Sequence, residues 1–283
     1  MRGNMGCNAL TWNMPWMAFT GVASRGWTLF TRTMTSLLTP AGTTGGVVSD
    51  NWYTDAIFAC GWEGGSDVKN TTGAGTATGD GVFTGGEDSY AGLSRITSGQ
   101  LAGTASLQMV YDAAGANDGS AYYDDPTNIS EVTCRCRVKL TENGMTTADD
   151  YAHFMNIKGP EAGWLSFLRI QYRNVAGVLK MRCYTANDST TYYQVGSDVT
   201  VVLNTEYVVE LYFKTSTEVG FKIWDYNTKA LVGSGTDTNA AHIRSTDPDK
   251  YLIGTSYGHV VSAQTTVVMD NFGIWAGTYR GCE

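Results

Sequence analysis

Apolar and polar residues alternate over most of the chain after residue 52. The clearest run is 131–140 (EVTCRCRVKL), in which Val132, Cys134, Cys136, Val138 and Leu140 share one face and basic residues occupy the other. A two-residue period is typical of a β-strand with one buried face. Similar runs recur along the chain between glycine, asparagine or aspartate, and none keeps a 3.6-residue period. The pattern predicts an all-β fold of two packed antiparallel sheets.

The predicted strands follow a short first strand that begins at residue 58. They lie at 90–96, 104–111, 131–140, 151–157, 164–173, 178–184, 206–214, 219–225, 251–255 and 265–275. A tight turn at Ala176 and Gly177 joins one hairpin, and 206–214 pairs with 219–225 in another.

The last predicted strand, 265–275 (TTVVMDNFGIW), carries a carboxylate among apolar residues. Strict alternation places Val268, Asp270, Phe272 and Ile274 on one face. A buried ionised carboxylate is normally paired, hydrogen-bonded or bound to a metal. A second carboxylate, Glu63, ends the first strand within 58–65 (FACGWEGG).

These two short motifs resemble those of the concanavalin A-like jelly rolls, the superfamily of lectins, glucanases and laminin-G-like modules. The resemblance spans roughly residues 51–283. It implies a jelly-roll sandwich whose first and last strands lie side by side, and a structural Ca²⁺ ion held by Glu63 and Asp270. Asp67 would add a third carboxylate, as a hard divalent ion requires many oxygen ligands. The alternative is that Asp270 caps backbone N–H groups or pairs with an arginine.

The N-terminal segment differs from the rest of the chain. Residues 1–48 hold Met1, Met5, Met14, Met17 and Met34 of the ten methionines, together with three of the eight tryptophans. Large apolar side chains are usually buried against other apolar groups. The segment is therefore predicted to be an arm, distinct from a jelly-roll domain at 49–283. It packs either on its own domain or on a partner, such as another copy of the chain.

Composition narrows the class of protein. The 283 residues include 34 glycines but only 5 prolines, and the formal charge of −8 argues against wholesale nucleic-acid binding. The mildly apolar stretch 10–38 is interrupted by polar residues, so it predicts neither a membrane span nor a signal peptide. We therefore expect synthesis in a cytoplasm, with association to a virion or other particle as one possibility.

Basic and polar residues gather on three predicted strands. They are Arg135 and Arg137 with Lys139; Arg169, Gln171 and Arg173; and Arg182 and Tyr184 with Lys180. If these strands are neighbours, the residues line one sheet surface, which in the resembling family holds a glycan. Arginines with Tyr184 and Gln171 suit an acidic polysaccharide. The alternative is an ordinary solvated sheet face.

Catalytic signatures of the family are absent. Glucanase relatives carry a Glu-x-Asp-x-Glu strand, which this sequence lacks. Arg135, His153, Gln171 and Tyr184 could in principle form a lyase site, but the lyase strand signatures are missing. The sequence favours a non-catalytic glycan-binding or adhesion module that serves as a structural or decoration component of an assembly such as a virion. A polysaccharide lyase or glycoside hydrolase acting on an acidic polysaccharide is the alternative.

Overall fold

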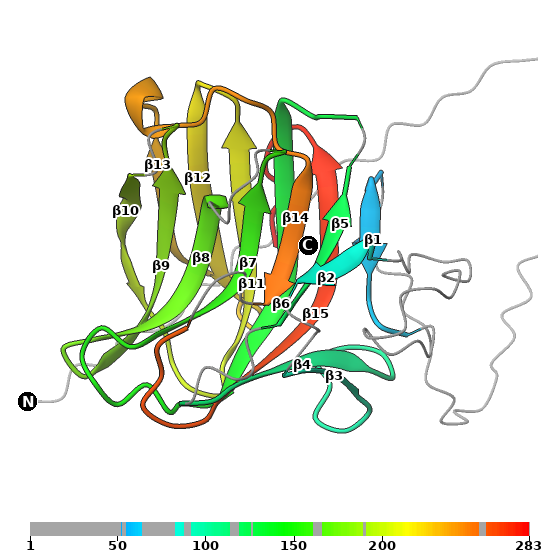
Figure 1. Ribbon diagram of the computed structural model, residues 1–283. Coiled ribbons are helices and arrows are strands. Elements are labelled where there is room, and N and C mark those ends of the chain that lie inside the picture. Colours follow the sequence, from blue (N-terminus) through cyan, green and yellow to red (C-terminus); the bar gives the residue numbers. More distant parts are fainter. Residues whose placement is uncertain are drawn as a thin grey trace, which may run out of the picture. The chain divides into compact units, whose positions relative to one another are not determined.

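The structure, a computed structural model, describes most of the chain after residue 51. It covers 52, 55–63, 83–87, 92–113, 119–125, 127–160, 166–188, 191–254 and 259–282. The predicted arm at 1–48, its boundary with the domain, and Asp67 lie outside the described residues. The described part forms two antiparallel sheets that face each other (Figure 1). The predicted all-β sandwich is therefore confirmed.

One sheet has eight strands. Its order is β13 (Leu231–Asp237), β12 (Glu218–Asp225), β11 (Glu206–Lys214), β6 (Glu131–Glu142), β15 (Thr265–Ala276), β4 (Ser106–Tyr111) and β3 (Leu93–Ile96), with β1 (Phe58–Cys60) paired to β15.

The other sheet has seven strands. Its order is β10 (Tyr192–Thr200), β9 (Val178–Ala186), β8 (Ser166–Val175), β7 (Tyr151–Lys158), β14 (Lys250–Gly254), β5 (Ser120–Asp124) and β2 (Gly85–Glu87). A short 3₁₀ helix, η4 (Ala240–His242), precedes β14. No helix among the described residues is long and apolar enough to cross a membrane.

The first and last strands lie side by side, as the family resemblance implies. Phe58 of β1 pairs with Ile274 of β15, and β4 continues along the same edge of β15. β6 pairs with the opposite edge. The last strand therefore lies inside its sheet, hydrogen-bonded on both sides.

The core lies between the inner faces of the two sheets. The inward residues of 131–140 are the predicted ones, and all five are at most 1% exposed. Cys134 and Cys136 are free thiols packed in this core. The alternation of β6 was therefore a correct guide to its buried face.

Strict alternation fails in β15. Val267 and Met269 join the core, and so do Phe272 and Ile274. The change of phase comes from a bulge between Asp270 and Gly273, where Asn271 has a φ of 49°. The prediction that Asp270 shares a face with Phe272 is wrong, because Asp270 pairs instead with Arg137 on the outer face of the eight-stranded sheet.

Two edge strands from different sheets meet closely at one side of the sandwich. A Cβ on Gly235 of β13 would lie 2.7 Å from the Cα of Gly196 of β10 and 2.6 Å from the ring of Phe221. A Cβ on Gly233 would lie 2.4 Å from Val199. Only glycine fits at such an approach, so these positions bring β10 and β13 together.

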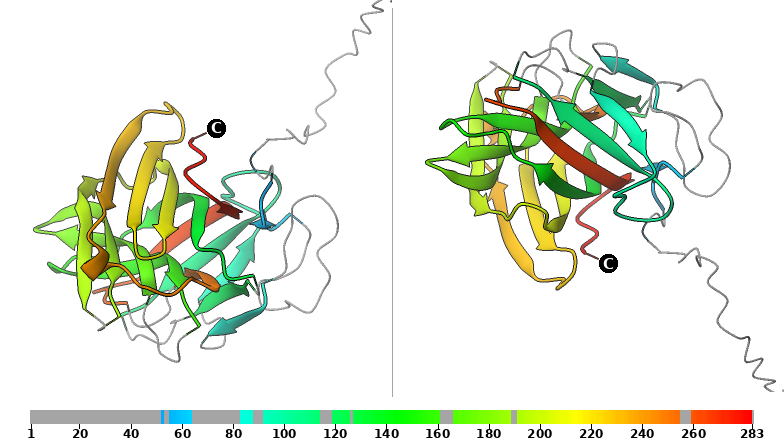
Figure 2. Two further views of the ribbon diagram at one scale, coloured as in Figure 1. Left: turned by 90° about the horizontal axis from the view of Figure 1, so that it is seen from above. Right: turned by 90° about the horizontal axis from the view of Figure 1, so that it is seen from below.

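The C-terminal residues follow β15 and pack on the outer face of the eight-stranded sheet (Figure 2). The Arg135 guanidinium lies 3.8 Å from the Trp52 ring and 4.9 Å from the Trp275 ring. It donates hydrogen bonds to the carbonyls of Trp52 and Gly281. Arg135 therefore has a structural role on this sheet.

Glu210 fixes the same C-terminal segment. Its Oε1 accepts hydrogen bonds from the backbone N–H groups of Arg280 and Gly281, each at 2.9 Å. Burial raises the pKa of Glu210 from its ordinary value of 4.5 to about 7, against the opposing effects of the Arg135 charge and these hydrogen bonds.

This pKa shift predicts a pH-dependent stability. The folded state holds the proton more tightly than the unfolded chain, so the stabilisation is present below pH 4.5 and is lost as the pH rises through about 7. As the pH rises from 4.5 to about 7, the unfolding free energy of the wild type should fall more than that of Glu210→Gln. The glutamine keeps an oxygen that accepts hydrogen bonds from Arg280 and Gly281 but does not titrate. Urea denaturation at several pH values checks this, and equal pH slopes would contradict it.

Candidate functional site

The basic residues predicted to share one surface lie on two sheets. Arg135 and Arg137 belong to β6, which pairs with β11 and β15 of the eight-stranded sheet. Both are buried; Arg137 forms a 2.5 Å ion pair with Glu206 and lies 3.8 Å from the Tyr226 ring. The prediction of one groove that includes Arg135 and Arg137 is wrong, because strand pairing places β6 in the other sheet.

The remaining predicted residues do lie together. β8, β9 and β10 are consecutive neighbours in the seven-stranded sheet, and their core-facing residues include Ile170, Met181 and Val195. The alternate positions face outward. We call this surface the β8–β10 face and define it by Arg169, Gln171, Arg173, Arg182, Tyr184, Tyr192, Gln194 and Asp198.

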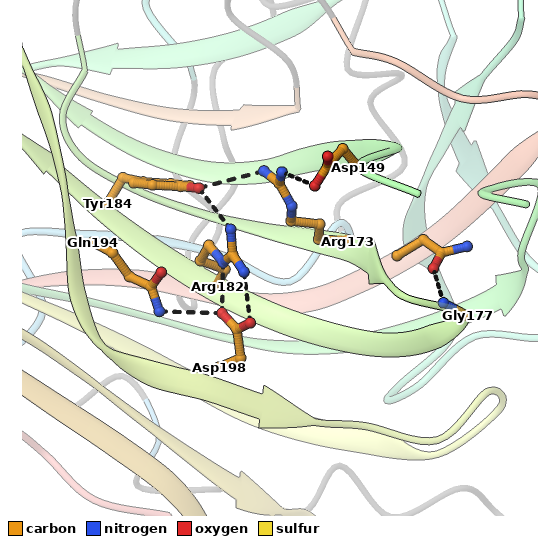
Figure 3. Close-up of polar contacts among 8 residues, drawn as sticks. Asp149, Arg173, Gly177, Arg182, Tyr184, Gln194 and Asp198 are labelled. Atoms are coloured by element: carbon orange, nitrogen blue, oxygen red, sulfur yellow. Dashed lines mark hydrogen bonds and ion pairs between the residues drawn. The ribbon is translucent and has the colours of Figure 1, made fainter. Parts of the chain in front are cut away.

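Two of the arginines on this face are paired with carboxylates (Figure 3). Arg182 binds both carboxylate oxygens of Asp198, at 2.5 and 2.6 Å, and Arg173 pairs with Asp149. The Tyr184 hydroxyl accepts hydrogen bonds from Arg182 at 3.0 Å and from Arg173 at 3.3 Å. The hydrogen bonds from Arg182 lower the pKa of Asp198, so this carboxylate is charged and neutralises its partner.

Gln194 extends this network at the edge of the face. Its side-chain amide donates to Asp198 at 3.2 Å (Figure 3). The carboxylate therefore accepts hydrogen bonds from both β9 and β10, which holds the outward side chains of the two strands in register.

Arg169 differs from these two arginines. Within the part of the chain that the structure describes, no carboxylate pairs with it, and its buried Nε has no hydrogen-bond partner. Its guanidinium carbon lies 4.0 Å from the Tyr192 ring centre and 5.5 Å from that of Tyr184. Burial lowers the pKa of Arg169, a sign of a cation that has lost solvent, while nearby tyrosines oppose the shift. The side chain is nevertheless partly exposed.

Two polar side chains lie beside Arg169 and are shut off from water. Gln171 of β8 pairs across strands with His153 of β7, and each is 1% exposed. The His153 Nε2 and the Gln171 Nε2 have no hydrogen-bond partner among the described residues. Burial first, and then the Arg169 charge, hold the pKa of His153 well below its usual range. His153 is therefore a neutral, enclosed imidazole.

The structure brings His153, Gln171 and Tyr184 to one sheet but leaves Arg135 on the other. The four residues of the lyase site that the sequence suggests therefore do not come together. The arginine that lies beside these residues is Arg169, not Arg135.

Glu63 and Asp270 hold the same loop. The Asp270 carboxylate accepts hydrogen bonds from the N–H groups of Ala102 and Asn271 and from the Ser106 hydroxyl, at 2.6 to 2.9 Å. The Glu63 carboxylate accepts from the N–H and hydroxyl of Thr104. The capping alternative for Asp270 is therefore what the structure shows.

These surroundings do not fit a Ca²⁺ ion at the described residues. The groups that face both carboxylates are hydrogen donors, whereas calcium needs six to eight oxygen lone pairs. No cluster of three or more His, Cys, Asp or Glu that could hold a metal occurs among the described residues. Because Asp67 lies outside them, the calcium site stays a prediction, and thermal unfolding with and without chelator tests it.

Three residues of the β8–β10 face were missed from the sequence. Tyr192, Gln194 and Asp198 lie on β10, a strand that the periodicity analysis did not predict. The outward positions Tyr192 and Gln194 do alternate with Tyr193 and Val195, but Gly196 interrupts the run. A search for aromatic residues in short polar segments would have found Tyr192, but not Gln194 or Asp198.

Comparisons with known proteins give similarity at the level of fold. No protein-family model matches the sequence, and no curated protein matches it. Among solved structures, the alginate lyase from Klebsiella pneumoniae aligns with a TM-score of 0.49 at 7% identity, covering 67% of this chain and 86% of the lyase. The cellulose induced protein Cip1 aligns with a TM-score of 0.47 at 15% identity, over 71% of this chain and 90% of Cip1.

Toxin binding domains are also similar. The binding domain of Paraclostridial Mosquitocidal Protein 1 aligns with a TM-score of 0.49 at 9% identity, over 81% of this chain and 50% of that domain. The chain thus spans about half the length of that domain.

Proposed function

We propose that this protein is a non-catalytic binding module for an acidic saccharide, which it holds on the β8–β10 face. The observation that supports this most is the Arg169 guanidinium, which lies over the Tyr192 ring and has no carboxylate partner among the described residues. A partly buried cation without a counter-charge is costly, and an anionic ligand group would offset that cost.

The tyrosines supply the second half of the site. Tyr184 and Tyr192 lie 5.5 and 4.0 Å from the Arg169 guanidinium carbon, and both are partly exposed. Aromatic rings at a surface stack on the apolar C–H face of a sugar, while neighbouring polar groups bind its hydroxyls. Gln194 is exposed beside them and offers such a group.

His153 supports binding over catalysis as the role of this face. A general base must reach the proton that it removes. The His153 imidazole is 1% exposed and its Nε2 is enclosed, so it does not meet a ligand on the surface. The lyase alternative predicts chain cleavage with a new double bond, which ultraviolet absorbance of a polysaccharide digest would detect.

The proposed binding is tested by titrating the full chain against a panel of acidic and neutral oligosaccharides. We expect an acidic member to bind, and Tyr192→Ala to weaken its binding by about five- to tenfold, the loss of roughly 1 kcal/mol of stacking. Tyr226→Ala is the matched control, because Tyr226 stacks on Arg137 on the other sheet. Equal losses in both variants, or no binding by the wild type, would reject the proposal.

A role as a structural or decoration component of a larger assembly such as a virion is compatible with this binding. It depends on residues 1–48, which lie outside the described residues. Copurification of the full chain with a particle, lost on deletion of 1–48 while the domain stays folded, is the corresponding test.

A further inference from the structure

The charges of the β8–β10 face restrict the ligand further, provided that this face binds a saccharide as proposed. Arg173 and Arg182 are already neutralised by Asp149 and Asp198. A ligand anion that competed for either arginine would have to displace a carboxylate held in the fold. These two arginines therefore offer no free charge to a ligand.

The face also carries negative charge that a polyanion would meet. The Asp149 side chain is 76% exposed, and Asp198 lies on β10 beside Arg182 and Lys180. Like charges brought close together repel, and the repulsion is strongest where solvent is displaced. A chain with an anion on every sugar would place some of its charges against these carboxylates.

Apart from the ion-paired Arg173 and Arg182, the next cation on this side of the sheet among the described residues is remote from Arg169. Lys180 lies on β9 four positions before Tyr184, the cross-strand partner of Arg169, which is about 13 Å along a strand. Lys180 lies near Asp198, and its charge helps to lower the pKa of that carboxyl. Lys180 is thus partly compensated and too far away to share one anionic group with Arg169.

The geometry of Arg169 suits one planar anion. The guanidinium carbon lies over the Tyr192 ring at 4.0 Å and the Nε is enclosed, so the terminal N–H groups are the donors left for a ligand. An arginine edge matches the two oxygens of a carboxylate, and such charge-assisted pairs are short and strong. Next to this point, on β9 and β10, the ligand would contact the Tyr184 and Tyr192 rings, which favour uncharged sugar surfaces.

From these charges and distances we infer that the ligand presents a single carboxylate, carried on an otherwise uncharged oligosaccharide, to the guanidinium edge of Arg169. Tyr184 and Tyr192 hold the neutral sugars next to that carboxylate. The inference excludes a densely sulfated chain as the preferred ligand of this face.

The test uses three probes with the full-length protein in isothermal titration calorimetry. They are an oligosaccharide with one carboxylate-bearing sugar, its carboxyl-reduced counterpart, and an oligosaccharide of equal length with a sulfate on every sugar. We expect the first to bind, the second to bind about 10- to 100-fold more weakly, and the third to bind more weakly than the first. Raising NaCl from about 0.05 to 0.5 M should weaken binding of the carboxylate probe by less than about tenfold, because salt screens only one ion pair.

Two variants test which cation of the protein binds the ligand carboxylate. Arg169→Gln should lose the same 10- to 100-fold for the carboxylate probe and lose nothing for its reduced counterpart. Lys180→Gln should change the binding of the carboxylate probe by less than about twofold. Circular dichroism of both variants confirms that they are folded before they are compared.

The outcomes separate this inference from the proposed function. If the reduced probe binds as tightly as the acidic one and Tyr192→Ala weakens both, the face binds saccharides but the inferred carboxylate is wrong. If the sulfated probe binds most tightly and Lys180→Gln weakens it, the ligand is a polyanion and the inference is again overturned. If none of the three probes binds, the proposed function fails as well.

Discussion

Replacing Gly235 by alanine is expected to lower the free energy of unfolding by about 3 kcal/mol, the upper part of the usual range for overpacking. The new Cβ would lie 2.6 Å from the Phe221 ring and 2.7 Å from the Gly196 Cα. The second contact is with backbone, so no side-chain rotation can relieve it. β13 would have to move away from β10, which opens the side of the sandwich where the two edge strands meet.

Ser234→Ala is the matched control, because Ser234 is the exposed neighbour of Gly235 on the same strand. Its substitution should change the unfolding free energy by no more than about 0.5 kcal/mol. Chemical denaturation followed by tryptophan fluorescence measures both variants. If Gly235→Ala is as stable as Ser234→Ala, then the close approach of β10 and β13 is not a feature of the protein in solution.

Replacing Asp270 by alanine should have an effect of similar size, roughly 3 kcal/mol. Three donors, the N–H groups of Ala102 and Asn271 and the Ser106 hydroxyl, would lose their acceptor. Asp270 is 0% exposed, so water does not replace the lost hydrogen bonds without a rearrangement of the loop. Amide hydrogen exchange should also become faster at Ala102.

Asp225→Ala provides the comparison for a carboxylate that is only half-buried. Asp225 accepts hydrogen bonds from the N–H and hydroxyl of Thr228 in an exposed turn, where water replaces the lost acceptor. We expect a loss of about 1 kcal/mol or less at this position. Equal losses for Asp270→Ala and Asp225→Ala would show that burial of Asp270 does not matter, contrary to the structure.

Strands with one clearly buried face were predictable from the sequence. β6, β11 and the β8–β9 hairpin each alternate because one set of side chains fills the core while the other faces outward. The turn residues Ala176 and Gly177 adopt positive φ, as a tight two-residue hairpin turn requires.

The strands that were missed are mostly at edges. β2, β10 and β13 end their sheets, and β5 lies next to β2. Edge strands bury fewer side chains and tolerate glycine, so their alternation is weak. The sequence LVGSGTD of β13 shows this directly.

Two errors concerned the candidate sites, and both come from information that local periodicity does not contain. β6 carries the same basic alternation as β8, yet it pairs with β11 and β15 in the other sheet. The bulge at Asn271 reverses the orientation of Asp270 through a single positive φ angle. Partner choice and bulges depend on contacts between distant segments, so only the structure could place Arg135, Arg137 and Asp270.

The central claim, that Arg169 and its tyrosines bind an acidic saccharide, is tested most directly by a crystal structure of the full chain with the carboxylate-bearing oligosaccharide. We expect the carboxylate at the guanidinium edge of Arg169, with sugar rings against Tyr184 and Tyr192. A saccharide bound on the outer face of the eight-stranded sheet, or on loops away from Arg169, would contradict the account.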